Sequence, residues 1–584
     1  MITSRQLSVS PILLALFALF ALLASPAPAQ WPDDPAVNLL VAGGPGEQVV
    51  PHAAVVPGDG PFAGHVWVGW YDNASGNYDV AVQLLTPAGE PLLPGGGLLV
   101  SDHPQNSWVM DWSLAADADG NAHVAFADIR DGDSNIHAYR IAPDGSFPWG
   151  PDGVTLTDDA DFKGPPCIAA TSDGQAVVAW MQAGASSVLR MQRLSATGTP
   201  LLPTGGVVVS EPDDASPAGN LLAPTDGGDV ILAWVPTYSF SANRQIKAQR
   251  FDAQGAPVWP QTVWVMDDAT LPMGHYFQLS PDGANGALLC WDVAVGNAFD
   301  ARVQRLDAAG NELLVHNGVY PEMGGPAGQL EPSAVVDLAT GEITMVYVDM
   351  NANQSERGLH AQRFDAAGNR LWGSSGTILL PRDGDLESLP ALTLVDGAVV
   401  GLVEQTPGGA YGQDLILGFR IDDDGHLAWG GAVPVGANPS DKGDLLAVTD
   451  GGATIGFWVD GRGGTPDLYA QNLNPDGTLG GTVTAASRPA LPAMVAAEPC
   501  WPNPFNPRTT IAFELPHRMP VALTIHDARG RLVRELVTGT LPAGRHERSW
   551  EATDARGRSL PSGVYHYRLA TPGRLVSHGM TLLK

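Results

Sequence analysis

Residues 303–310 read VQRLDAAG, and nearly the same letters return at residues 248–255 (AQRFDAQG) and 361–368 (AQRFDAAG). Alternating polar and apolar residues running into Asp-Ala-Ala-Gly indicate a strand that enters a tight turn, because glycine adopts positive φ at no steric cost. A segment of this kind ends in glycine eight times, at Gly89, Gly145, Gly198, Gly255, Gly310, Gly368, Gly425 and Gly477. Such recurrence is typical of repeat architectures.

Two further landmarks recur in fixed order with this segment. One is a turn, at Asp59-Gly60, Asp119-Gly120, Asp173-Gly174, Asp226-Gly227, Asp282-Gly283, Thr340-Gly341, Asp396-Gly397 and Asp450-Gly451. The other is an apolar run ending at Trp70, Phe126, Trp180, Trp234, Trp291, Tyr347, Val403 and Trp458. The spacing gives a mean period of about 55 residues over the range 36–481.

One repeat contains four strands and almost no helix signal. The second strand, for example residues 66–70 (VWVGW), is apolar on both faces and is expected to be covered on both sides. The third strand, for example residues 248–251 (AQRF), alternates, and we expect it to be half exposed. Four-stranded units at this period predict a β-propeller, with a linear solenoid as the alternative.

The ends of the repeat array favour a closed ring. The last complete landmark is Gly477, so the eighth unit lacks its final strand, while residues 37–60 resemble the missing part as it occurs in residues 206–227. N-terminal strands that complete the last blade would remove the exposed edges of a linear array. We predict an all-β fold, an eight-bladed β-propeller of four-stranded blades followed by a small Ig-like β-sandwich.

The order of the landmarks resembles sialidase-like propeller repeats over roughly residues 36–481, in architecture only. The S-x-D-x-G-x-T-W turn, the Arg-Ile-Pro motif and a three-arginine carboxylate clamp of that group are missing. Sialidase activity is therefore not expected from the resemblance.

The charge is divided unevenly along the 584 residues. The chain carries 31 Lys+Arg and 62 Asp+Glu, a net charge of −31. Residues 501–584 hold 12 basic and 6 acidic residues, so the first 500 hold 19 and 56. A body this acidic repels phosphate backbones, which excludes nucleic acid as a partner. Three cysteines provide no disulfide framework, and Cys167 and Cys290 are interpreted as small buried residues.

The N-terminus has the pattern of an export signal. Residues 12–24 are an apolar run, shorter than the roughly 20 residues of a membrane span, and small residues Ala27 and Ala29 follow at the positions that signal peptidase reads. We predict a signal peptide at 1–29 cleaved after Sec-dependent export to the periplasm, with an uncleaved anchor as the alternative. No later segment is apolar for long enough to span a bilayer.

Motifs that carry chemistry are few in the repeat region. Asp128, Asp131 and Asp133 place carboxylates close together in one loop, which suits a structural Ca²⁺ site or an ordinary solvated turn. The loop from Asp460 to Asp467 likewise suits either a Ca²⁺ site or an ordinary solvated turn. We expect no other cofactor and no catalytic residue, because zinc, nucleophile-elbow and phosphate-loop motifs are missing.

Histidines and tryptophans of the repeats have both a structural and a functional interpretation. His123 and His137 lie in strand patterns and are expected to be structural. Six tryptophans offer sugar-stacking surface or, since most recur at repeat positions, packing between blades: Trp67, Trp112, Trp149, Trp259, Trp372 and Trp429.

The tail has a different organisation. Residues 482–498 are rich in Ala and Pro and are interpreted as a linker. In the domain that follows, 499–584, the proline-rich stretch WPNPFNP precedes six alternating strands separated by Gly-containing turns, which predicts a β-sandwich. The predicted strands are 510–515, 521–526, 532–536, 546–551, 564–569 and 575–583.

The tail resembles the type A C-terminal sorting domain of the type IX secretion system and the Ig-like domain of flagellar hook-capping proteins. The matching residues are Pro502, Asn503, Pro504, Phe505, Asn506, Pro507, Gly544, Gly563 and Tyr565. The resemblance implies a diderm host, recognition by an outer-membrane translocon, and display on the surface or release. A terminal packing module is the alternative.

These observations predict a monomeric secreted or surface-displayed propeller, a non-catalytic module that binds a glycan or protein ligand. The alternative is a secreted hydrolase or lyase of polysaccharide with carboxylates at the propeller mouth, and a third possibility is a structural surface protein without a dedicated ligand. An enzyme would gather perturbed carboxylates around the central funnel, and a binder would lack them.

Overall fold

The computed structural model describes residues 31–103, 111–130, 132–212, 214–239, 242–275, 277–296, 298–322, 328–481, 496–497, 500–515, 519–527, 529, 531–541, 544–571 and 574–584. The predicted signal peptide, with Ala27 and Ala29, lies outside these residues, as does most of the predicted linker. In the part of the chain that the structure describes, no helix is long and apolar enough to cross a membrane.

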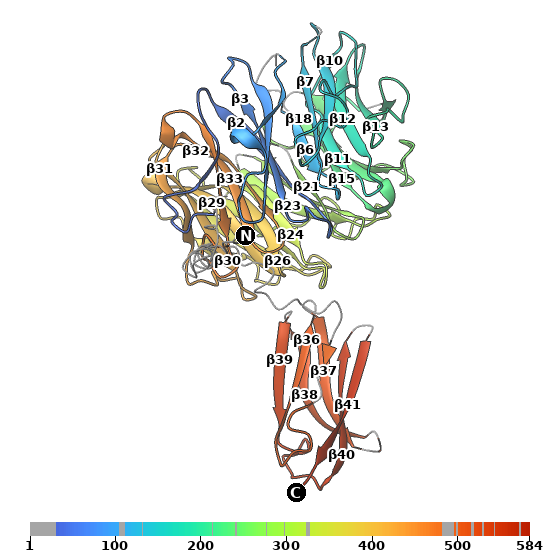
Figure 1. Cartoon of the computed structure of the whole chain (residues 1–584), viewed down its shortest axis with the longest axis vertical. Helices are drawn as coiled ribbons and strands as arrows, with labels where there is room; N and C mark the ends of the chain where they lie inside the picture. The colour runs from blue at the N-terminus through green and yellow to red at the C-terminus, as the bar shows by residue number, and fades with distance from the viewer. Residues whose placement is uncertain are drawn as a thin grey trace, which may run out of the picture.

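The repeat region folds into successive antiparallel sheets, drawn from blue to orange in Figure 1. Sheet 1 contains β2 (Gln48–Val55), β3 (Val66–Asp72), β4 (Asp79–Leu85) and β5 (Leu98–Ser101). Sheet 2 contains β6 (Ser113–Ala116), β7 (Ala122–Asp128), β8 (Asn135–Ile141) and β9 (Val154–Thr155). Sheet 3 contains β10 (Phe162–Lys163) and β11 (Cys167–Ala170), both paired with β12 (Ala176–Ala183), then β13 (Ser187–Leu194) and β14 (Val207–Val208). Sheet 4 contains β15 (Ala218–Pro224), β16 (Val230–Val235), β19 (Ile246–Phe251) and β20 (Val263–Met266), beside the hairpin β17 (Thr237–Ser239) and β18 (Ala242–Arg244).

The second half continues in the same way. Sheet 5 contains β21 (Gln278–Pro281), β22 (Ala287–Val295) and β23 (Ala298–Leu306). Sheet 6 contains β24 (Gly328–Val336), β25 (Ile343–Met350), β26 (Arg357–Phe364) and β27 (Thr377–Leu380). Sheet 7 contains β28 (Leu386–Val395), β29 (Ala398–Thr406), β30 (Asp414–Ile421) and β31 (Val433–Ser440). Sheet 8 contains β32 (Lys442–Thr449), β33 (Thr454–Asp460), β34 (Asp467–Leu473) and the N-terminal strand β1 (Leu39–Ala42). Helical structure in the described chain is limited to the 3₁₀ turns η1 (Pro94–Gly96), η2 (Asp226–Gly228), η3 (Pro407–Gly409) and η4 (Gly461–Gly463).

The first strands of neighbouring sheets contact one another around the region. β2 contacts β6, β6 contacts β11, and the series continues until β32 of sheet 8 contacts β2 of sheet 1. Between sheets 5 and 6, both β22 and β23 contact β24. The region is therefore all-β and propeller-like.

A side chain from one sheet covers the turn of the next sheet, which explains why glycine ends the repeated segment. These glycines have φ near +80°, and a Cβ at Gly310 would lie 2.5 Å from the Trp259 ring. A tryptophan or leucine of the preceding sheet covers each one: Trp31 on Gly89, Leu93 on Gly145, Trp149 on Gly198, Leu202 on Gly255, Trp259 on Gly310, Leu314 on Gly368, Trp372 on Gly425 and Trp429 on Gly477. The backbone angle favours glycine at all eight positions, and where a tryptophan covers the turn its ring also leaves no room for a Cβ.

Burial of the strands confirms one prediction and corrects another. The second strand is covered on both faces as predicted, with every residue of β3 up to Tyr71 buried. The third strand is not half exposed, since β19 is buried except at Arg250. Its polar residues point into the structure, where the Gln249 amide bonds the backbone of Trp259. A regular polar residue thus marks an internal hydrogen bond rather than a solvent face.

The tail forms two antiparallel sheets (red in Figure 1). One contains β35 (Ala496–Ala497), β36 (Thr509–Leu515) and β39 (Gly544–Trp550). The other contains β38 (Leu532–Leu541), β37 (Met519–Asp527), β40 (Gly563–Thr571) and β41 (Arg574–Leu582). They enclose one core that includes Phe505, Trp550 and Tyr567. The strands lie where the alternation predicted them, and β35 shows that the predicted linker contributes a short strand at its end.

Candidate functional site

The repeat region contains a pocket of about 510 Å³ between the first strands of sheets 5 to 8, which we call the axial pocket. Its floor is aliphatic, because β28 and β32 contribute Leu389, Leu392, Leu445 and Leu446. Its polar groups come from sheets 5 and 6: His275, Gln278, Asp292, Glu331 and Ser333. A few convergent polar groups over an apolar floor are typical of small-molecule sites.

A histidine and a carboxylate form the best-defined polar pair in the pocket. His275 Nδ1 lies 2.7 Å from Asp292 Oδ2, and the imidazole is parallel to the Phe299 ring at 5.8 Å. The hydrogen bond to Asp292 raises the pKa of His275 above its ordinary value, although partial burial opposes it. Asp292 is buried, so it holds the ring in place and leaves Nε2 for a ligand.

Glu331 lies in the pocket beside this pair and also joins two sheets. Its Oε2 accepts the backbone N–H of Leu389 at 2.6 Å. Glu331 and Leu389 have φ of 51° and 50°, and Asp444 and Val50 repeat this geometry between sheets 8 and 1, with φ of 52° and 53°. Each of these residues lies at a register shift in its first strand, as does Gly219 with φ of 58°, so the geometry is a β-bulge of the repeat.

Two further carboxyl groups, in β28 and β29 of sheet 7, hold protons more tightly than usual. Burial raises the pKa of Glu404 to about 7, helped by the charges of Asp414 and Glu331. Burial also raises the pKa of Glu387 to about 7. One oxygen of each is buried without a hydrogen-bond partner among the described residues. Neither residue lines the axial pocket, and the link to it is the charge of Glu331, which helps to raise the pKa of Glu404. Sequence reasoning singled out neither residue.

The chemistry of this arrangement suits hydroxyl-rich ligands. His275 offers a nitrogen that donates when protonated and accepts when neutral, while Glu331 offers an acceptor and Gln278 offers both. Sugar hydroxyls need mixed donors and acceptors, and the leucine floor suits their C–H faces. The same His–Asp pair has the form of a general base or acid.

The predicted calcium loop is arranged around an arginine in its described part. Arg130 Nη2 lies 2.6 Å from Asp128 Oδ2, and His137 Nε2 lies 3.2 Å from Asp128 Oδ1. Burial alone would raise the pKa of Asp128, but these partners outweigh it and lower the pKa to about 2. Asp133 is exposed, and Asp131 lies outside the described residues. The three-carboxylate site therefore stays a prediction.

In the loop that begins at Asp460, the carboxylate is likewise paired with basic side chains of the protein. Arg462 Nη2 lies 2.5 Å from Asp460 Oδ2, and Lys442 Nζ lies 3.1 Å from it. Among the described residues, no group of three or more His, Cys, Asp or Glu side chains is arranged to hold a metal ion.

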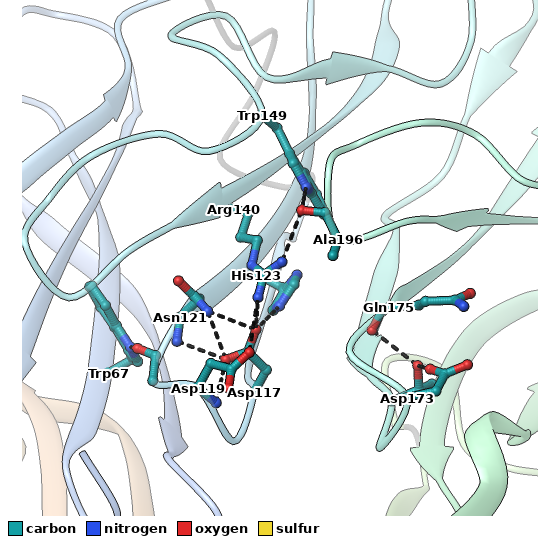
Figure 2. A network of polar contacts seen from close by, with 12 residues as sticks. Trp67, Asp117, Asp119, Asn121, His123, Arg140, Trp149, Asp173, Gln175 and Ala196 are labelled. Atoms are coloured by element: carbon teal, nitrogen blue, oxygen red, sulfur yellow. Dashed lines mark hydrogen bonds and ion pairs between the residues drawn. The ribbon is translucent and has the colours of Figure 1, made fainter. Parts of the chain in front are cut away.

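Figure 2 shows that His123 and Trp149 belong to a structural network, as the packing interpretation predicted. Asp117 accepts from His123 Nε2 at 2.9 Å and from Arg140 Nη2 at 2.7 Å. Arg140 and Trp149 then both donate to the carbonyl of Ala196 in the next sheet, at 2.9 Å and 3.1 Å. The network holds one hairpin turn of sheet 3 against sheet 2.

The other singled-out side chains also have structural roles. Tryptophans between the third and fourth strands of a sheet donate to a turn of the next sheet in the same way, Trp259 to Ala308, Trp372 to Asp423 and Trp429 to Pro475. Trp67 and Trp112 are fully buried. Cys167 and Cys290 are free and buried, and burial raises the pKa of each thiol to about 12.

Most residues that carry the predicted resemblance to a sorting domain meet at one end of the sandwich. Phe505 exchanges backbone hydrogen bonds with Thr581 and Leu583 and packs on Trp550, which in turn contacts Tyr565. Asn503 bonds the backbone of Thr581 at 2.8 Å. The exposed members at this end are Pro502, Asn503, Pro504, Asn506, Pro507 and Gly563. Gly544 pairs with Leu515 and lies at the opposite end.

Sequence reasoning did not find His275, Asp292 or Glu331. Only Asp292 had a signal, because it directly follows the landmark Trp291. The pocket groups come from three separate strands and a loop, and their convergence depends on how neighbouring sheets pack.

Comparison with known proteins identifies one part of the chain. Residues 505–572 match the FlgD Ig-like domain family, which confirms the resemblance of the tail to the hook-capping Ig-like domain. No curated protein matches the chain.

Several solved structures are similar in overall fold. The Dos1 propeller has a TM-score of 0.44 at 11% identity, covering 74% of this chain and 93% of its own. A polysaccharide lyase of family PL25, an ulvan lyase, has a TM-score of 0.40 at 10% identity, covering 77% and 97%. The microbial sialidase Hz136 has a TM-score of 0.29 at 12% identity, covering 52% and 67%. Likenesses at this level carry no argument about activity or ligand.

Proposed function

We propose that the protein is an exported binding module in which eight sheets form eight blades and the axial pocket takes a hydroxyl-rich ligand such as the end of a glycan. The observation that carries this proposal is the pocket itself, with His275 and Glu331 over a leucine floor. The pocket places two carboxylates beside one histidine, so a neutral sugar suits it better than an acidic one.

The test is a glycan array followed by calorimetry on each hit, with matched variants. His275→Gln and Glu331→Gln are expected to weaken binding at least tenfold. His316→Gln is the control, because His316 makes a similar pair with Glu312 at 2.9 Å outside the pocket. Binding that is equal in all three variants places the ligand elsewhere.

A specific observation favours a second candidate, a hydrolase or lyase of polysaccharide. His275 is held by Asp292 as a general base would be, and Glu404 keeps a proton near neutral pH. Incubation of polysaccharides with the protein, followed for new reducing ends and for unsaturated sugar products, distinguishes this candidate. Turnover that disappears in His275→Gln supports the enzyme, and binding without product release supports the binding module.

The route to the surface is part of the same proposal. A signal peptide at 1–29 takes the chain to the periplasm, and the Ig-like tail acts as a type IX sorting signal for an outer-membrane translocon, delivering a monomer to the cell exterior. Its support is the match of the tail to an Ig-like family together with the exposed Pro-Asn-Pro loop. Truncation after Glu498 in the native host is expected to leave the propeller in the periplasm. Undiminished surface delivery contradicts the sorting role.

A further inference from the structure

Two turns of the sandwich have the same sequence and the same internal bonds. Residues 527–531 and 554–558 both read DARGR. Asp527 Oδ1 accepts the backbone N–H groups of Arg529 and Arg531 at 2.9 and 3.0 Å, and Asp527 Oδ2 accepts Arg531 Nε at 2.8 Å. Asp554 makes the equivalent bonds to residues 556 and 558 at 2.9, 2.9 and 2.8 Å. Each turn therefore fixes one guanidinium and leaves another, Arg529 or Arg556, outside these bonds.

The two turns are attached to each other and line one groove. Ala555 N donates to Val533 O at 3.1 Å, and Arg534 Nη1 donates to Asp554 O at 3.3 Å. The groove has a volume of about 760 Å³ and is lined by all four turn arginines and by Leu532, Val564 and Tyr565.

The groove combines positive charge with exposed apolar side chains. Arg531 and Arg558 are 74% and 71% exposed, and Leu532 and Val564 are 61% and 49% exposed. Four arginines face two carboxylates, so the groove keeps a net positive charge. Trp501, 78% exposed, precedes the Pro-Asn-Pro loop at the same end of the sandwich.

From this juxtaposition we infer that this end of the sandwich docks on an anionic lipid surface, where the arginines bind phosphate headgroups. Arginine forks match phosphate geometry. A soluble phosphate would leave Leu532 and Val564 in water, whereas a lipid surface buries them and suits an interfacial tryptophan. The acidic repeat region does not prevent docking, because charges more than about 8 Å away are screened at physiological ionic strength. The inference does not depend on the proposed export route.

The test is vesicle co-sedimentation with the chain from Gln30 to Lys584, since the apolar run at residues 12–24 would itself bind lipid. The vesicles are phosphatidylcholine alone and phosphatidylcholine with phosphatidic acid. We expect binding to the second only, and a fall in binding as salt is raised. Arg529→Ala/Arg556→Ala is expected to weaken binding by about 30-fold, because each basic residue near an anionic leaflet contributes roughly a fivefold factor.

The matched control is Arg568→Ala/Arg357→Ala, which removes the same charge at sites outside the groove and should bind like the unaltered chain. Leu532→Ser tests the apolar part of the groove. It is expected to bind more weakly, so that a lower salt concentration than the unaltered chain requires is enough to abolish its binding. Equal losses in both arginine pairs, or equal binding to neutral vesicles, overturn the inference. Binding of inorganic pyrophosphate by calorimetry without vesicle binding also overturns it, and assigns the groove to a soluble phosphate.

Discussion

Replacing Trp31 with alanine tests whether the N-terminal segment completes the last sheet and joins it to the first. Trp31 is 2% exposed, covers Gly89 of sheet 1 and donates its indole N–H to Pro87 O at 2.9 Å. These are the contacts that Trp149 makes on Gly198 and Ala196 in the middle of the region. If the N-terminal segment joins the last sheet to the first, the two tryptophans are equivalent and should contribute equally to stability.

The expected loss is large for both residues. Truncating a buried tryptophan to alanine costs about 3–5 kcal/mol in lost transfer energy and cavity formation. The lost indole hydrogen bond leaves a carbonyl without this partner, which contributes roughly 1 kcal/mol of that cost. We therefore expect Trp31→Ala and Trp149→Ala each to lower the free energy of unfolding by about 4 kcal/mol.

Trp31→Leu is the matched control. Leucine covers the equivalent glycine at three junctions, through Leu93, Leu202 and Leu314. It should restore roughly half of the loss, because it fills the site without the hydrogen bond.

Urea unfolding followed by tryptophan fluorescence measures the effect, because 14 of the 16 tryptophans lie between residues 31 and 458. The reasoning is refuted if Trp31→Ala unfolds like the unaltered protein while Trp149→Ala loses about 4 kcal/mol. That result would mean that Trp31 contributes nothing to the packing on sheet 1.

Three other substitutions test the site and the repeat. Glu404→Gln should be more stable than the unaltered protein above pH 7, by on the order of 3 kcal/mol. The reason is that the pKa of Glu404 is raised from 4.5 to about 7, so the unaltered protein loses stability as pH rises between those values. Unfolding curves at about pH 5 and pH 8 measure the difference, and parallel pH profiles of the two proteins contradict it. Asp128→Asn should lower the free energy of unfolding by about 3–5 kcal/mol with chelator present, because Arg130 loses its buried partner. A chelator that lowers the Tm of the unaltered protein would instead indicate bound calcium. Gly310→Ala should lower the free energy of unfolding by at least about 2 kcal/mol, because the new Cβ would lie 2.5 Å from the Trp259 ring and φ is +83°. An unchanged Tm in thermal unfolding refutes this account.

Some of the fold was predictable because its causes are local. A glycine with φ near +80° recurs wherever the chain turns, and a both-faces-apolar strand such as β3 marks a covered strand whatever its neighbours are. The strand limits of the tail followed from alternation in the same way. The third strand was misjudged, because alternation is expected both of a solvent face and of buried glutamines such as Gln249 that bond the backbone.

The axial pocket was not predictable, because it depends on distance between strands far apart in the chain. His275 and Asp292 have no spacing that distinguishes them from other His and Asp residues, and Glu331 resembles any of the many acidic residues of the repeats. Likewise, the sequence did not show that Asp128 pairs with Arg130, and the calcium site at Asp128, Asp131 and Asp133 stays a prediction.

The sequence alone thus determined the length of the repeat, the positions of its turns and the all-β character of the chain. It also determined the boundary between an acidic repeat region and a basic tail. All of these depend on residues close together in the chain. Only the tertiary structure decided which side chains meet. It showed that Trp31 covers the turn of sheet 1, that pocket groups from sheets 5 and 6 converge, and that two DARGR turns share one groove. The physical reason is that a contact between sheets depends on how whole strands pack, whereas a turn depends on the φ and ψ of a few neighbouring residues.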